Sequence, residues 1–190
     1  MIDKIYIFDD IISKEEQEDL KNTLLGNDFP WFYLEDVTSP KANLQSRSGF
    51  CHNFYNDYQV KSSRVKLIKN VIDNSLKKIN FKLNKIIKSR AFLQVPLRLD
   101  VSENLIDSPH IDIDIEHLVV LYYVTDTDGD TILYNETFKD GIELPSQKDV
   151  TERQRITPKQ GRVVVFNGNI YHSGTQSINN NRVLINTNVI

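Results

Sequence analysis

Leu118-Val-Val-Leu-Tyr-Tyr-Val124 is the stretch of sequence that decides the fold. It is a short run of β-branched and aromatic residues, which favour strands over helices. Similar short runs with turns between them fill the rest of the C-terminal part of the chain, at residues 86–87, 91–99, 131–134, 162–166 and 182–190. The C-terminal two thirds of the chain is therefore predicted to be mostly β.

The N-terminal part has a different pattern. Residues 5–8 predict a short strand, and Ser13-Lys-Glu-Glu16 is a capping box that predicts the start of a helix, which runs to Leu25 and stops at Gly26. A second helix is predicted from about Ser62 to Ile79, because apolar residues recur there at intervals of three and four. Its apolar stripe should pack against a sheet.

Length and composition indicate one folded domain. The chain has 190 residues, of which 39% are hydrophobic and 26% charged, as in ordinary globular proteins. A net charge of -3 gives no basic surplus for a phosphate backbone, so nucleic acid is not expected as a partner. No apolar run is long enough to span a membrane. Cys51 is the only cysteine, which excludes an intrachain disulfide and favours a reducing compartment, the cytoplasm.

Asp128-Gly129 is a dipeptide that tight hairpin turns favour, and it lies between two predicted strands. Asp126, Asp128 and Asp130 also alternate as at the start of a calcium-binding loop. The glycine and the following Glu136 are at the wrong positions for such a loop. The sequence therefore favours a hairpin turn.

His110-Ile-Asp112 is the strongest functional signal. Residues two apart on a strand point to the same face, so an imidazole and a carboxylate would lie side by side. His172 comes after the strand predicted at 162–166, where an antiparallel neighbour could bring it to this pair. Two histidines and one carboxylate are the ligand set that holds non-haem Fe(II) on one face. Arg182, ten positions further on, could hold an acidic cosubstrate.

Each part of this pattern also has a structural explanation. A His-x-Asp triplet arises by chance in many chains, and a histidine is often only a hydrogen-bonded surface residue. His52 and His117 are better explained in that way than as metal ligands. The ordered combination of all four residues favours a metal site.

The chain resembles the Fe(II)/2-oxoglutarate-dependent dioxygenases, in particular the prolyl 4-hydroxylase branch. The resemblance covers about residues 91–190. It is carried by Ser108-Pro-His-Ile-Asp112, Leu121-Tyr-Tyr-Val124, Asp128-Gly-Asp-Thr131, Gly161-Arg-Val-Val-Val-Phe166, His172 and Arg182.

The resemblance implies a mainly β chain with flanking helices, an α+β fold with a double-stranded β-helix, or jelly-roll, of the cupin-like type. Residues 1–190 would form a single domain, with N-terminal helical support at about 1–85 and the jelly-roll core at about 86–190. Fe(II) would be held by His110, Asp112 and His172. The cosubstrates would be 2-oxoglutarate and O2, and ascorbate is a further candidate.

Arg182 would pair with the distal carboxylate of 2-oxoglutarate, because a planar guanidinium grips a carboxylate with two hydrogen bonds. Some family members add a serine hydroxyl two residues after this arginine, but the residue here is Leu184. The resemblance points instead to Tyr123 for that hydroxyl, with Tyr122 in the opposite layer as core. Asp112 favours hydroxylation over halogenation, because related halogenases have a small residue there.

The reaction implied is hydroxylation of a peptidyl proline or of a similar peptide or small molecule, with release of succinate and CO2. Two alternatives remain open: a jelly-roll binding module without catalysis, and a nucleobase demethylase. Arg98 could contact the substrate or simply face solvent, and residues 137–157 could form a mobile lid. The abundance of Asn, Lys and Ile would suit an AT-rich bacterial or phage genome. The sequence gives no indication of the oligomeric state.

Overall fold

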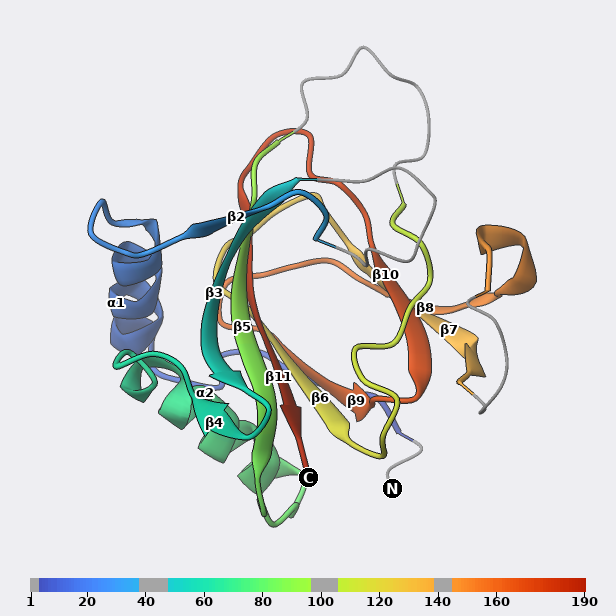
Figure 1. Cartoon of the computed structure of the whole chain (residues 1–190), viewed down its shortest axis with the longest axis horizontal. Coiled ribbons are helices and arrows are strands. Elements are labelled where there is room, and N and C mark those ends of the chain that lie inside the picture. The colour runs from blue at the N-terminus through green and yellow to red at the C-terminus, as the bar shows by residue number, and fades with distance from the viewer. Residues whose placement is uncertain (1–3, 38–47, 97–105, 139–144) are drawn as a thin grey trace.

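The computed structural model describes residues 4–37, 48–96, 106–138 and 145–190. The strands in these residues form two antiparallel sheets (Figure 1). The large sheet has the strand order β1-β9-β6-β11-β5-β3-β2, with β4 paired to β3, and the small sheet has the order β10-β7-β8. The strands are β1 (Tyr6–Phe8), β2 (Phe32–Leu34), β3 (Gly49–Asn56), β4 (Gln59–Val60), β5 (Ile86–Gln94), β6 (Leu118–Tyr123), β7 (Thr131–Thr137), β8 (Glu152–Ile156), β9 (Val163–Asn167), β10 (Ile170–Gly174) and β11 (Arg182–Val189).

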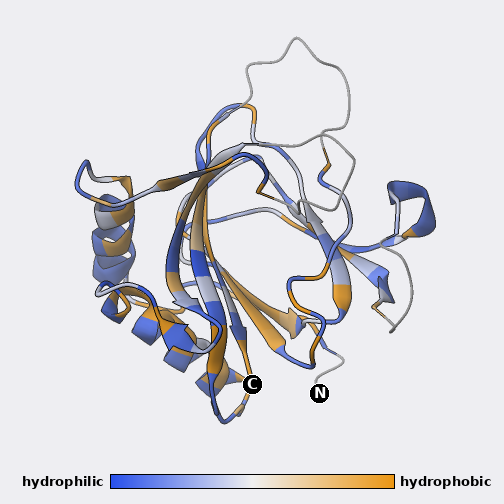
Figure 2. Cartoon of the chain, in the orientation of Figure 1, coloured by the Kyte–Doolittle hydropathy of each residue, from blue (hydrophilic) through white to orange (hydrophobic). Residues whose placement is uncertain are grey.

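The large sheet is covered on both faces, which is why β6 and β9 are almost entirely apolar (Figure 2). On β6, Leu118, Val120 and Tyr122 pack against the helices, whereas Val119, Leu121 and Tyr123 face the interior between the two sheets. This alternation follows from the two-residue period of a strand. The mainly β, jelly-roll fold with supporting helices is thus confirmed, and so is the position of Tyr122 in the opposite layer.

Two helices, α1 (Lys14–Leu25) and α2 (Lys66–Lys78), lie on the outer face of the large sheet. The capping box predicted at α1 is present: the Ser13 hydroxyl accepts from the backbone N–H of Glu16, and the Glu16 carboxylate accepts from that of Ser13. The second helix starts four residues later than Ser62. Its N-cap is Val65, whose side chain makes no capping hydrogen bond.

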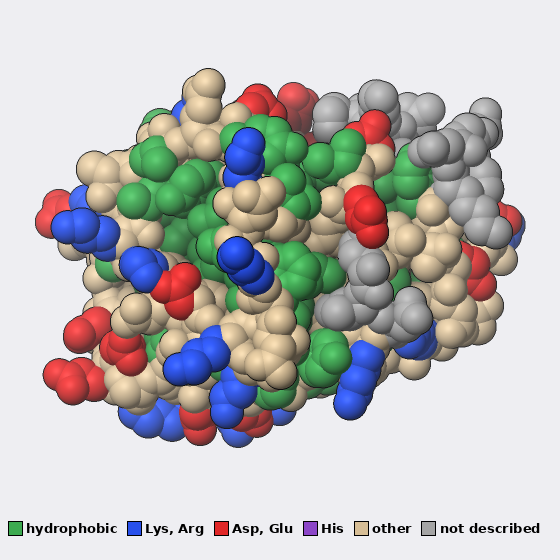
Figure 3. All heavy atoms as spheres, turned by 90° about the horizontal axis from the view of Figure 1, so that it is seen from below, with side chains coloured by type: hydrophobic (Ala, Val, Ile, Leu, Met, Phe, Trp, Pro, Cys, Tyr) green, Lys and Arg blue, Asp and Glu red, His purple; other side chains and the backbone are tan. Residues whose placement is uncertain are grey.

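The first 85 residues contribute strands as well as helices. β1 pairs with β9 at one edge of the large sheet, and β3 pairs with β5 further along it. The apolar side chains of α1 and α2 then complete the core on the outer face. No helix in the described part of the chain is long and apolar enough to cross a membrane. On one face of the molecule, hydrophobic side chains gather near the middle with Lys and Arg side chains among them (Figure 3).

The predicted hairpin at Asp128-Gly129 is wrong. β6 and β7 belong to different sheets, and the segment between them crosses from one to the other. The Asp128 carboxylate accepts hydrogen bonds from Ser177, Ile178 and Asn179, which is also inconsistent with a calcium loop because those donors occupy its oxygens. A local turn signal does not determine which strands pair.

Residues 137–157, for which a mobile lid is a possibility from the sequence, contain regular structure. Within residues 137–157, β8 pairs along β7, and a short 3-10 helix, η1 (Gln147–Asp149), precedes it. Residues 139–144 lie outside the described residues. The strand pairing fixes the second half of this segment on the small sheet.

Gly161 joins the segment after β8 to β9 in a backbone conformation that only glycine adopts easily, with φ of +82°. A Cβ atom there would lie 2.4 Å from Oε1 of Gln17, whose side chain is buried. We expect Gly161→Ala to destabilise the protein by about 3 kcal/mol, from backbone strain plus overpacking, and to lower Tm by roughly 6–12 °C. Thermal unfolding measures this.

The double variant Gln17→Ala/Gly161→Ala separates the two causes of that destabilisation. It removes the side-chain clash but keeps the backbone strain, so it should unfold at a higher temperature than a sum of the two single effects predicts. A Gly161→Ala variant as stable as the wild type would contradict the expectation.

Candidate metal centre and its pocket

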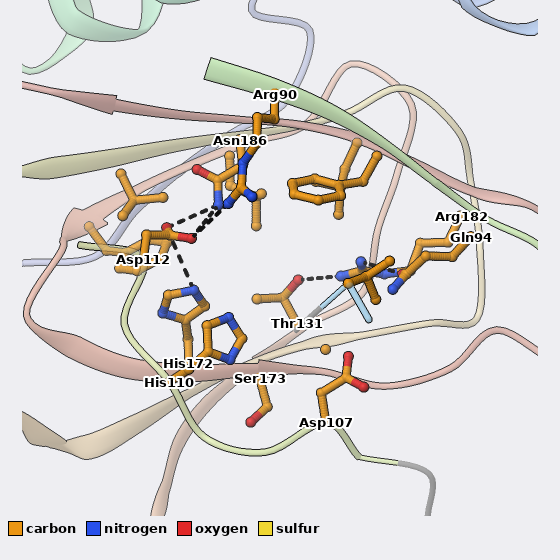
Figure 4. A pocket seen from close by; sticks show the side chains of 17 residues that line it. Arg90, Gln94, Asp107, His110, Asp112, Thr131, His172, Ser173, Arg182 and Asn186 are labelled. Carbon is orange, nitrogen blue, oxygen red and sulfur yellow. Dashed lines mark hydrogen bonds and ion pairs between the residues drawn. The ribbon is translucent and has the colours of Figure 1, made fainter. Parts of the chain in front are cut away.

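His110, Asp112 and His172 converge in a pocket between the two sheets (Figure 4). One potential ligand atom from each residue lies within 4.8 Å of the others. Nε2 of His172 is 3.8 Å from Oδ2 of Asp112, and the two imidazole rings have centroids 4.5 Å apart. Two nitrogens and one carboxylate oxygen thus face one point, as a facial ligand set requires.

The ring orientation of both histidines is fixed by the backbone. Nδ1 of His110 is 2.9 Å from the carbonyl oxygen of Ser108, and Nδ1 of His172 is 3.2 Å from that of Ile170. A proton on Nδ1 donated to a carbonyl leaves Nε2 unprotonated and available to a metal. Burial lowers the pKa of His172 to about 4, so this ring is neutral at physiological pH.

The local structure at this site differs from the sequence prediction. His110 and Asp112 do not lie on a strand: His110 forms a single isolated bridge with His172, and the chain around it is irregular. His172 lies within β10, not just past a strand end. Two backbone hydrogen bonds between the histidines, of 2.9 and 3.0 Å, take the place of a full ladder. The side chains nevertheless meet.

Asp112 is held by two asparagines of β11. Nδ2 of Asn186 donates to both carboxylate oxygens, at 3.2 and 3.0 Å, and Nδ2 of Asn188 donates to Oδ2 at 3.0 Å. Burial alone would raise the pKa of Asp112, but the nearby His172, Arg90 and His110 together with the Asn186 hydrogen bond lower it below the usual range. The carboxylate is therefore ionised and oriented before any metal arrives.

Asn186 and Asn188 should consequently control metal affinity. We expect Asn186→Leu/Asn188→Leu to weaken Fe(II) binding by roughly 10–100-fold, the usual cost of removing groups that orient a ligand. Anaerobic titration of the purified protein with Fe(II) measures this. Asn70→Leu, on the exposed face of α2, is the control and should bind iron like the wild type. Unchanged affinity in the double variant would show that Asp112 needs no such support.

Arg182 lies at the other end of the same pocket and is only 5% exposed. Its guanidinium donates to the backbone carbonyl of Gly129 at 2.8 Å, to Oε1 of Gln94 at 3.0 Å and to Oγ1 of Thr131 at 2.9 Å. No carboxylate of the described residues forms an ion pair with it. The three hydrogen-bond partners are neutral, and the carboxylates of Asp107 and Asp130 act on the charge of Arg182 only through space. A buried cation without a direct ion pair favours an anionic ligand in the pocket.

Tyr123 is fully buried on the same inner face but does not line the pocket. Burial raises its pKa to about 12, so the phenol stays protonated. The hydroxyl that hydrogen-bonds to Arg182 is that of Thr131, and Leu184 lines the pocket as an apolar wall. Arg98 lies outside the described residues.

Neither His52 nor His117 belongs to the group of possible metal ligands among the described residues. Nδ1 of His52 is 2.8 Å from the carbonyl oxygen of Pro30 and its Nε2 is 2.8 Å from the Ser62 hydroxyl. Nδ1 of His117 is 2.7 Å from the carbonyl oxygen of Ile115.

Sequence reasoning missed the groups that support the site: Gln94 and Thr131 at Arg182, and Asn186 and Asn188 at Asp112. One signal for the asparagines was present. They lie on a strand that is buried on both faces, where a polar side chain needs a partner. No comparable signal marks Thr131, because threonine is common in strands.

Comparisons with known proteins agree with this geometry. Neither a family model nor a curated protein sequence matches the chain. Among solved structures, the chain is similar to a prolyl hydroxylase from Trichoplax adhaerens in complex with a peptide fragment of hypoxia inducible factor, with 14% identity, a TM-score of 0.64 and coverage of 98% of this chain and 83% of that one.

Two further structures show the same fold. A 2OG-Fe(II) oxygenase family oxidoreductase from Burkholderia pseudomallei matches at 10% identity with a TM-score of 0.67, covering 97% of this chain and 84% of that one. The alpha ketoglutarate dependent epimerase SnoN from nogalamycin biosynthesis matches at 11% identity with a TM-score of 0.68, covering 98% and 78%. The chain therefore has the fold of the 2OG-Fe(II) oxygenases, with a His-Asp-His group in its pocket.

Proposed function

We propose that the chain, as a single domain, is an Fe(II)- and 2-oxoglutarate-dependent oxygenase. One observation carries the proposal: the pocket has a group of three metal-binding side chains at one end and a buried arginine without an ion-pair partner among the described residues at the other. The neighbours of the same fold support it, and one of them, SnoN, was solved with Fe3+ and alpha ketoglutarate.

The side chains in the pocket suit both Fe(II) and 2-oxoglutarate. His110, Asp112 and His172 would hold the metal through Nε2, carboxylate oxygen and Nε2, because the Nδ1 atoms of both rings are occupied by carbonyls. Arg182 would hold the distal carboxylate of 2-oxoglutarate, with the Thr131 hydroxyl beside the guanidinium. Tyr123 is a further candidate for a hydroxyl that contacts this carboxylate. Bound Fe(II) with 2-oxoglutarate and O2 would supply the oxidising chemistry, with release of succinate and CO2.

The protein itself would orient these groups in a partly apolar pocket. Phe166, Leu121 and Leu184 line the same pocket as the metal group and Arg182. This apolar wall strengthens the electrostatic interactions of the charged groups in the pocket. The intact and assembled metal group favours an oxygenase over a jelly-roll binding module without catalysis.

For the reaction, we propose hydroxylation of a peptidyl proline or of a similar peptide or small molecule. The prolyl hydroxylase neighbours support this choice, and the peptide bound to one of them shows what that protein accepts. The epimerase neighbours have the same fold, so the fold alone does not determine the substrate.

An anaerobic titration with Fe(II) and 2-oxoglutarate tests the proposal. The chelate of a 2-oxo acid with Fe(II) has a visible charge-transfer band, which we expect in the wild type. The band should be absent in Asp112→Ala and weaker in Arg182→Ala. A wild-type protein that retains no iron and gives no band would favour the binding-module alternative.

A further inference from the structure

One face of β5 carries a row of polar and aromatic side chains toward the pocket. Alternation along the strand places Lys88, Arg90, Phe92 and Gln94 on this face. Their partners on β11 are Asn188, Asn186, Leu184 and Arg182, in that order. Gln94 hydrogen-bonds to Arg182, whereas Arg90 lies beside Asp112. The row therefore begins with Gln94 at the proposed cosubstrate end of the pocket, passes the metal group at Arg90, and ends at Lys88.

Arg90 connects the metal pocket to a neighbouring cleft, since its side chain lines both. Its guanidinium lies over the ring of Phe92, 4.7 Å from the ring centroid, and one nitrogen is 3.9 Å from Oδ1 of Asp112. Asp112 already accepts three hydrogen bonds from asparagines and faces two histidines. Because the negative charge of Asp112 is shared among these groups, it neutralises only part of the positive charge of Arg90.

Lys88 adds a second positive charge. Among the described residues, no hydrogen bond or ion pair forms at its ammonium group, and it lines the same cleft as Arg90. Burial and the charge of Arg90 lower the pKa of Lys88, and the more weakly acting charges of Asp112 and Asp57 offset this only in part. Lys88 and Arg90 therefore repel each other. An anion bound between Lys88 and Arg90 would offset this repulsion.

The rest of the cleft reinforces the positive charge. Lys61 and Arg64 also line it, and no aspartate or glutamate does so among the described residues. The whole chain has a net charge of -3, so this cluster of four cations is a local feature and not the result of a basic composition. A cleft of one sign attracts ligands of the opposite sign.

We propose that the substrate is a small acid whose carboxylate or phosphate binds to Arg90 and Lys88, at the side of the metal group opposite Arg182. The inference rests on the proposed function and narrows its substrate class. Arg90 is next to a metal ligand, so the anionic group lies close to the carbon that reacts. An internal prolyl residue of a peptide brings no anion to this position, whereas a free acid does.

Residue-resolved NMR tests the inference with simple probes. The protein is loaded with Zn(II), a diamagnetic substitute for iron, and with saturating 2-oxoglutarate, which occupies Arg182. Acetate and inorganic phosphate are then titrated separately, with acetamide as the neutral probe of similar shape to acetate. We expect both anions, but not acetamide, to shift the signals of Lys88 and Arg90.

Three variants determine whether these two residues bind the anion. We expect Arg90→Gln and Lys88→Gln each to raise the dissociation constant of the preferred anion by about tenfold, because charge-assisted hydrogen bonds are lost. Lys77→Gln, on the exposed face of α2, is the control and should bind like the wild type. The NMR spectrum of Arg90→Gln shows whether that variant folds. If it does not fold, the anion affinity of Lys88→Gln tests the inference.

The outcomes separate this inference from the proposed function. Equal shifts with acetamide and the anions, or anion binding that neither variant weakens, would overturn the small-acid substrate. A preference for phosphate over acetate, or the reverse, identifies the anionic group. Failure of Zn(II) and 2-oxoglutarate to shift signals near His110 and Arg182 would contradict the proposed function instead.

Discussion

Asp112→Ala is expected to abolish Fe(II) binding and all Fe(II)-dependent turnover. The substitution leaves two imidazoles without the anion that completes the facial set, and two ligands hold Fe(II) much more weakly than three. It also leaves the amides of Asn186 and Asn188 without their acceptor. Iron affinity measured anaerobically, and succinate formation from 2-oxoglutarate, should both fall below detection.

Asp114→Ala is the matched control for that experiment, because Asp114 is an exposed aspartate two residues along the same segment. It should bind iron like the wild type. Retention of full iron affinity by Asp112→Ala would exclude Asp112 as a ligand and leave its hydrogen bonds with β11 as a structural feature only.

Arg182→Leu is expected to weaken the binding of 2-oxoglutarate strongly while leaving the metal group intact. Losing a paired set of charge-assisted hydrogen bonds should weaken 2-oxoglutarate binding by roughly 10–100-fold or more. The change also leaves Gln94, Gly129 and Thr131 with buried acceptors that lack a donor, so Tm should fall. Calorimetric titration of the Fe(II)-loaded protein with 2-oxoglutarate under anaerobic conditions measures the affinity.

Two further variants identify the role of the guanidinium. Arg182→Lys keeps the charge but cannot make two parallel hydrogen bonds, so its affinity for 2-oxoglutarate should be intermediate. Arg155→Leu removes a surface arginine and should have no effect on that affinity. If Arg182→Leu binds 2-oxoglutarate as tightly as the wild type, another group holds the distal carboxylate.

The sequence predicted the elements whose signals are local. The capping box at Ser13 determined the start of α1, and the alternating burial on β6 followed from its β-branched and aromatic residues. The metal group was also predictable, because its residue types are rare in combination. Its members meet through sheet pairing that brings β10 against the segment around His110.

The rest depends on long-range pairing that local patterns do not encode. Asp128-Gly129 has the composition of a hairpin turn, yet the strands on either side join different sheets. Asn186 and Asn188 acquire their role only because Asp112 reaches them from 74 and 76 positions away. The roles of Tyr123 and Arg98 stay predictions.

β11 carries Arg182, which we propose binds the cosubstrate, and the two asparagines that hold Asp112, all on one face of the strand. A slip of one residue in its pairing would turn all three outward at once. It is also the last described strand in the sequence, in the middle of the large sheet. During synthesis, therefore, the sheet remains split at its centre until this strand leaves the ribosome and inserts between β5 and β6. Until then the pocket lacks Arg182, and Asp112 lacks its two asparagine partners.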